Sequence, residues 1–82
     1  MKITIESTTK IVQFKTSAYA DSVPARIWEG FTETGTPVHC FITRISPTIP
    51  KDDPRNDEFV EQLQECKAPS VDVQAIPLRM IL

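Results

Sequence analysis

The chain has 82 residues, which is the length of one small domain and lies near the lower limit for a single hydrophobic core. Its formal net charge is −2 and its pI is close to 5.2, an acidic balance that argues against general nucleic-acid binding. We expect one α+β domain over residues 1–82. No apolar run approaches the roughly 18 residues of a membrane span, so we also expect no membrane contact.

The N-terminal residues 3–14 predict a first hairpin. Ile3 and Ile5 alternate with polar neighbours, a short polar run follows, and residues 10–14 are again typical of a strand. The alternation also replaces the continuous apolar run that a signal peptide needs, so we expect a cytoplasmic protein. Residues 15–22 have no period and predict an exposed connection, with Tyr19 as its one candidate surface anchor.

A second hairpin is predicted over residues 23–45, around a turn that contains Gly35. A two- or four-residue loop places Ile27 opposite Ile42, whereas a three-residue loop with Gly35 in the left-handed region shifts the pairing by one residue. Such a shift exchanges every cross-strand partner between the two faces. Burial favours the first register, because it gathers one apolar face for a helix to cover: Ile27, Phe31, Val38, Cys40 and Ile42.

Three prolines between residues 47 and 54 interrupt the strand, and a helix is predicted to begin at the last of them. Asp53 is the expected N-cap and Pro54 the first helical residue. Pro69 is expected to end the helix. Its apolar stripe consists of Phe59, Val60, Leu63 and Cys66.

The tail, residues 71–82, alternates loosely and ends apolar. Pro77 cannot donate a ladder hydrogen bond, so this segment is expected as a strand at the sheet edge. The predicted fold is therefore α+β, with an antiparallel sheet of four to five strands and one helix packed on one face. The sheet would contain two hairpins and the C-terminal edge strand.

Catalytic and metal-binding patterns are weak in this sequence. His39 and Cys40 are neighbours in a strand and point to opposite faces, and Cys66 alone does not complete a tetrahedral zinc site. Both glycines lie in the second hairpin, so neither opens a phosphate-binding helix. We therefore expect no enzyme, no cofactor and no metal. Capping of the helix already explains the paired carboxylates at its start: Asp52, Asp53, Asp57 and Glu58.

The candidate binding site is the other face of the second hairpin, where the preferred register places Arg26, Trp28, His39 and Phe41. These residues form either a second small core or a recognition surface, because an aromatic ring beside a guanidinium suits a protein interface or a phosphate-bearing ligand. The same register puts Arg44 on the opposite side. Since one helix covers one face only, we expect a homo-oligomer, most simply a homodimer.

Residues 2–12, 23–30 (VPARIWEG) and 37–45 (PVHCFITRI) resemble short accessory proteins encoded by tailed phages and prophages. The resemblance spans most of the chain and identifies a gene neighbourhood more than an activity. It implies a phage factor that inhibits a host defence component by protein capture, with acidic side chains mimicking the charge of nucleic acid. The alternatives are an oligomer that sequesters a nucleotide signal through Arg26 with Trp28 or Phe41, and a minor structural or regulatory phage protein.

Overall fold

The structure is a computed structural model that describes residues 1–15 and 22–81, so Tyr19 and its connection lie outside the described residues. It has an α+β fold in which a four-stranded sheet has the order β3-β2-β1-β4. Neither helix of the described chain is long and apolar enough to cross a membrane. The elements in chain order are β1 (Ile3–Lys15), β2 (Val23–Thr32), β3 (Pro37–Ile42), α1 (Arg55–Leu63), α2 (Val71–Gln74) and β4 (Arg79–Ile81).

Three strands, β1, β2 and β3, form the antiparallel part of the sheet, and β4 pairs with β1 in parallel at the edge. The predicted antiparallel sheet of four to five strands is therefore wrong, because only three of the four strands are antiparallel. The expected first hairpin is one continuous strand, because the polar residues 7–10 form a bulge and not a turn. The C-terminal segment does reach the sheet edge, as predicted.

The bulge in β1 is stabilised by one buried side chain. Ser7 pairs with Trp28 and Ile11 with Arg26, so three β1 residues lie opposite Ile27 alone. Thr8 is completely buried there, and its hydroxyl donates a hydrogen bond of 2.7 Å to the Ile27 carbonyl oxygen. The Thr8 side chain therefore supplies a partner that the interrupted ladder does not, and buried backbone carbonyls require one.

The register of the second hairpin differs from the preferred one by one residue. Arg26 lies opposite Ile42 and Ile27 lies opposite Phe41, because the turn has three residues and Gly35 adopts a φ of +88°. The Gly35 N–H donates to the Thr32 carbonyl, and the Thr32 N–H donates to the Thr36 carbonyl. Turn geometry thus decided the pairing that burial alone had assigned wrongly.

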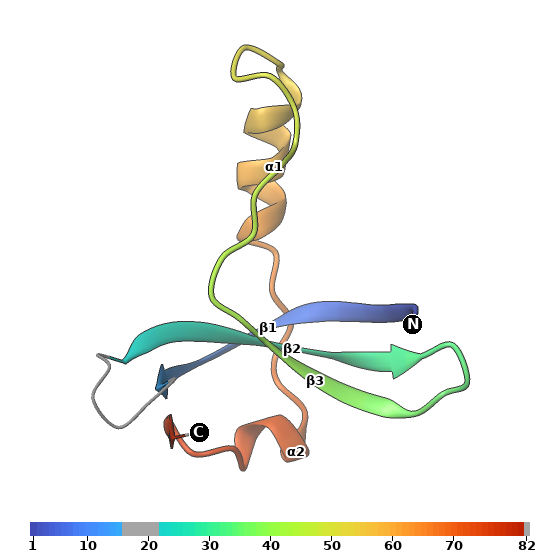
Figure 1. The fold of residues 1–82 in the computed structure, drawn as a ribbon, viewed down its shortest axis with the longest axis vertical. Coiled ribbons are helices and arrows are strands. Elements are labelled where there is room, and N and C mark those ends of the chain that lie inside the picture. The colour runs from blue at the N-terminus through green and yellow to red at the C-terminus, as the bar shows by residue number, and fades with distance from the viewer. Residues whose placement is uncertain (16–21, 82) are drawn as a thin grey trace.

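The hydrophobic core lies on one face of the sheet, which we call the inner face, and α2 covers it (Figure 1). Val73 of α2 is fully buried, and the Ser70 hydroxyl caps this helix by accepting the Val73 N–H. The interpretation of residues 71–74 as part of a strand was therefore wrong. The core comprises Val12, Ala25, Ile27 and Val73, with Phe14, Phe41 and Ile76 packed against it.

Helix α1 stands away from the opposite, outer face of the sheet (Figure 1). No residue of α1 is buried, so the prediction that this helix packs on the sheet was wrong. We call residues 46–65 the arm, because an extended segment rises from the sheet and α1 returns to it. The radius of gyration is 14.5 Å, whereas a compact chain of this length has about 12 Å. The arm accounts for this open shape.

The chain passes from the arm to α2 around the edge of β1. Lys67 donates its backbone N–H to the Ser7 carbonyl and accepts the Thr9 N–H, at 3.1 and 3.0 Å. α1 ends at Leu63, before this pairing and earlier than the predicted stop at Pro69. On the inner side, the Glu29 carboxylate accepts the Ser70 N–H at 3.1 Å and lies 3.3 Å from the Lys67 ammonium.

The bonds to Glu29 stabilise its charged form. The Ser70 N–H has the largest effect, and Lys67 adds to it, so together they hold the pKa of Glu29 below its ordinary value of 4.5 despite partial burial. Glu29 therefore links β2 to the crossing segment most strongly when its carboxylate is ionised.

Candidate functional site

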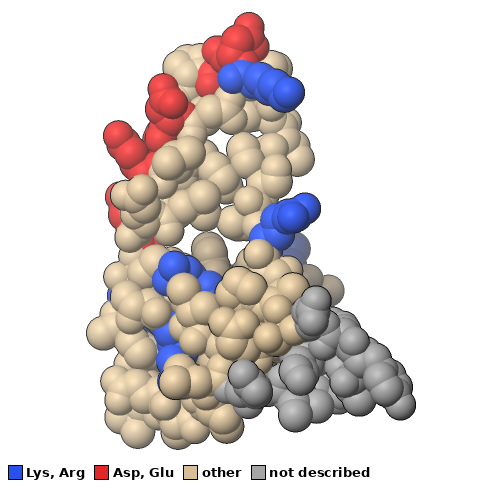
Figure 2. Space-filling model, turned by 90° about the vertical axis from the view of Figure 1, so that its left-hand side faces the viewer, with Lys and Arg blue, Asp and Glu red and all other residues tan. Residues whose placement is uncertain are grey.

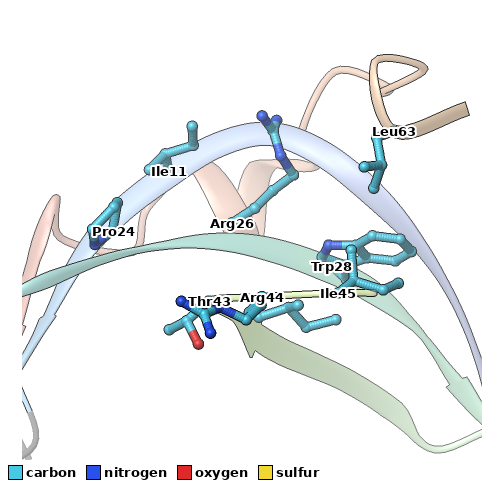
Figure 3. A pocket seen from close by; sticks show the side chains of 9 residues that line it. Ile11, Pro24, Arg26, Trp28, Thr43, Arg44, Ile45 and Leu63 are labelled. Atoms are coloured by element: carbon cyan, nitrogen blue, oxygen red, sulfur yellow. The ribbon is translucent and has the colours of Figure 1, made fainter. Parts of the chain in front are cut away.

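The outer face of the second hairpin carries a cleft at the base of the arm. Arg26 and Trp28 rise from the same side of β2, and Leu63, at the end of α1, lies over the indole (Figure 3). Their common side follows from strand geometry, because residues two apart in a strand share a face. The cleft has a volume of about 220 Å³.

The cleft combines cationic, aromatic and aliphatic groups. Arg26 and Arg44 supply guanidinium groups, Trp28 supplies an indole, and none of the nine lining residues is acidic. Arg44 is exposed, whereas Arg26 and Trp28 are half-buried. The aliphatic walls are formed by Ile11, Ile42, Ile45 and Leu63.

Arg26 is held in place by the bulge of β1. Its Nη1 donates a hydrogen bond of 2.8 Å to the Thr8 carbonyl oxygen, and Thr8 is itself fixed to β2 through its hydroxyl. One edge of the guanidinium is therefore anchored. Because a guanidinium carries five N–H donors in a planar fork, the others remain to bind a ligand.

The four predicted site residues separate into two pairs. Arg26 and Trp28 lie on the outer face, but Phe41 lies on the inner face, where its ring stacks on Phe14 with centroids 5.8 Å apart. His39 also faces the inner side and is exposed. It borders a separate polar cleft of about 360 Å³ that also contains Glu6, Glu29, Lys67 and Asp72.

Arg44 is the residue that the sequence interpretation assigned to the wrong side. In the observed register Ile42 is opposite Arg26, so Arg44, two residues further on, comes to the same cleft. The signal that finds it is the turn: a Gly that supplies a positive φ after two loop residues fixes the three-residue connection.

The arm presents a surface of opposite charge. Six acidic and two basic residues give the arm a formal charge of −4, whereas the rest of the chain has five acidic and seven basic residues and a charge of +2. Figure 2 shows the red carboxylates along one edge of the arm and blue groups on the sheet region below. The acidic residues are Asp52, Asp53, Asp57, Glu58, Glu61 and Glu65.

The tip of the arm is tied by side chains. Asn56 donates its amide to the carbonyls of Pro50 and Asp53, at 2.8 and 3.0 Å. Asp53 accepts the Arg55 N–H at 2.9 Å and pairs with the Arg55 guanidinium at 2.7 Å. The N-cap of α1 is Pro54, which has no side-chain cap bond, so the predicted N-cap at Asp53 and first helical residue at Pro54 were each one residue too early. The Arg55 side chain lowers the pKa of Asp53, and Asp53 raises the pKa of Arg55.

The described sulfur and imidazole groups lie apart. His39 faces the inner side, its neighbour Cys40 lies opposite Trp28 on the outer side, and the Cys66 thiol contacts the Leu63 carbonyl at 3.8 Å. Within residues 1–15 and 22–81, no three His, Cys, Asp or Glu side chains are grouped so that they could hold a metal ion.

Neither family models, curated proteins nor solved structures match this chain. Its function is therefore argued from the cleft and the arm.

Proposed function

We propose that this chain is a non-enzymatic binding protein that captures a partner protein through its arm. The observation that carries the proposal is the placement of α1: none of its residues is buried, and apart from Leu63 at its C-terminal end the helix stands away from the sheet (Figure 1). A helix that contributes so little to its own core has its surface available for a partner.

The chemistry of that surface specifies the partner. Glu58 and Glu61 are three residues apart, so they share one side of α1, and Val60, which is 53% exposed, lies on another side with Asp57 three residues before it. An apolar residue among carboxylates suits a basic protein surface, because charge complementarity speeds association and apolar burial holds the complex. The partner we expect is a protein whose basic surface normally binds nucleic acid.

The arm is also ordered before it binds. The Asn56 amide and the Asp53–Arg55 pair fix the tip, so little conformational entropy remains to be lost on association. Together with the resemblance to phage accessory proteins, these features favour a host defence component as the partner and inhibition as the result, since occupation of a basic surface by the arm competes with nucleic acid.

The test compares two variants that each remove two negative charges. Glu58→Gln/Glu61→Gln neutralises the arm, and Glu6→Gln/Glu33→Gln neutralises exposed positions outside it. Each immobilised protein is incubated with bacterial host lysate, and the retained proteins are quantified. We expect the wild type and the second variant to retain the same basic protein, and the arm variant to retain about tenfold less.

The retained protein is then purified and tested against labelled duplex DNA and RNA. Displacement of the nucleic acid by the wild-type chain, and not by the arm variant, supports inhibition by charge mimicry. Equal retention by both variants, no retention by the wild type, or a ternary complex with nucleic acid overturns the proposal.

A further inference from the structure

We propose that the cleft at the base of the arm binds a nucleotide, with its phosphate held by Arg26 and Arg44 and its base resting against Trp28. This goes beyond capture of a protein by the arm, because it concerns the outer face of the sheet. The juxtaposition is specific to the observed register, which brings Arg44 to the side of Arg26 and Trp28.

The phosphate position follows from the guanidinium groups. Arg26 is anchored by its 2.8 Å bond to the Thr8 carbonyl, so it is oriented without a ligand, and exposed Arg44 can close from solvent. Guanidinium groups match the geometry of phosphate oxygens in pairs of hydrogen bonds. Since none of the lining residues is acidic, neither arginine is neutralised inside the cleft.

The base position follows from the indole and its surroundings. Trp28 is half-buried and faces the hollow, with Ile45 and Leu63 beside it (Figure 3). A planar heteroaromatic ring gains stacking energy on such an indole, of the order found for base–aromatic contacts in nucleic-acid complexes. The aliphatic side chains around the cleft shield the face of the bound base from water, and they form no hydrogen bonds with the polar edge of that base.

The size of the cleft limits the ligand to a small one. Its volume of about 220 Å³ is below the range of about 300–1,000 Å³ that is usual for enclosed ligand sites. A single nucleotide therefore occupies it with the sugar towards solvent. The acidic arm disfavours a longer polyanion, because successive phosphates would approach its carboxylates.

The experiment uses Trp28 as its own reporter, because it is the only tryptophan in the chain. Its indole N–H gives one resonance in a proton–nitrogen correlation spectrum, which is followed while AMP, inorganic phosphate or adenosine is added to the full-length protein. We expect AMP to shift this resonance with an affinity about tenfold higher than that of phosphate or adenosine alone.

The matched variants are Arg44→Gln in the cleft and Arg55→Gln at the tip of the arm, both at exposed positions. Loss of a charged hydrogen bond predicts that Arg44→Gln weakens AMP binding by about tenfold or more, while Arg55→Gln leaves it unchanged. The proposal is overturned if AMP causes no shift up to about 10 mM, if phosphate binds as tightly as AMP, or if both variants weaken binding equally. Retention of a partner by the arm is expected to be unaffected by Arg44→Gln, so the two proposals fail separately.

Discussion

The two helices of this protein contribute to it in opposite ways. α1 has nine residues and an apolar stripe, yet none of its residues is buried; α2 has four residues, and its Val73 lies at the centre of the core. The difference lies in what each helix meets. α2 follows directly from the segment that wraps β1 and is pressed onto the inner face, whereas α1 meets the sheet only at its C-terminal end, near Trp28.

This contrast shows that amphipathic spacing predicts a helix but not its contacts. Of the predicted stripe, Phe59, Val60 and Leu63 lie in α1, whereas Cys66 lies beyond the end of the helix at Leu63. Phe59 and Leu63 are half-buried, with Leu63 at the cleft beside Trp28, and Val60 is left to solvent. The arm therefore uses part of its apolar surface locally and presents the rest.

The contrast is tested most strongly by truncating one valine in each helix. Val73→Ala removes two methyl groups from a filled core and should lower the free energy of unfolding by about 2–3 kcal/mol. Val60→Ala, at an exposed position, should change it by less than about 0.5 kcal/mol. Urea titration monitored by circular dichroism measures both. Equal losses would mean that α1 packs as tightly as α2 in solution.

The next largest effect is expected at the bulge that supports the cleft. Thr8→Val keeps the shape of the side chain but leaves the buried Ile27 carbonyl without its hydroxyl donor, which should cost about 2 kcal/mol. Thr9→Val, at an exposed neighbour, is the control and should cost less than about 0.5 kcal/mol. The same urea titration measures the pair, and a neutral Thr8→Val would show that the carbonyl finds another donor.

The smallest effect concerns the joint between the arm and α2. Because the pKa of Glu29 is lower in the folded chain than its ordinary value of 4.5, the unfolded chain binds more protons between these two values, and stability falls as the pH drops through them. Glu29→Gln should cost about 1 kcal/mol at pH 7, and its difference from the wild type should shrink below pH 4.5.

Urea titrations at a series of pH values test this dependence, with Glu33→Gln in the exposed turn as the control. A difference between Glu29→Gln and the wild type that stays constant down to the acid-unfolding range would show that the Ser70 and Lys67 contacts do not favour the ionised carboxylate.

Patterns of neighbouring residues in the sequence predicted most of the elements whose formation depends on neighbouring residues. The second hairpin, a helix after the last proline and the edge position of the tail were all predictable from turn and proline chemistry, although the helix is capped at Pro54 and not at Asp53. The missed α2 carried a signal of the same kind, since Ser70 precedes a short segment with an acidic residue in its first turn.

The composition of the site depended on one undecided variable, the hairpin register. Arg26 and Trp28 share a face in either register because they lie on one strand, and this part of the prediction is independent of pairing. The residues opposite them on β3 do depend on the pairing. The wrong register therefore placed His39 and Phe41 in the predicted site and left Arg44 out of it. Burial could not choose between registers, because the outer face is apolar too: Ile11, Val38 and Ile42 lie there with Trp28.

Both ends of the arm return to the same point in the molecule. Ile45, just before it, lines the cleft with Trp28, and Cys66, just after it, lines a second, more open hollow that Trp28 also borders. Because both ends of the arm lie near Trp28, a short connector can replace the arm without altering the order or register of the strands. The arm, which is twenty consecutive residues, 46–65, can therefore be exchanged for one that binds a different partner, while the sheet and α2 stay the same.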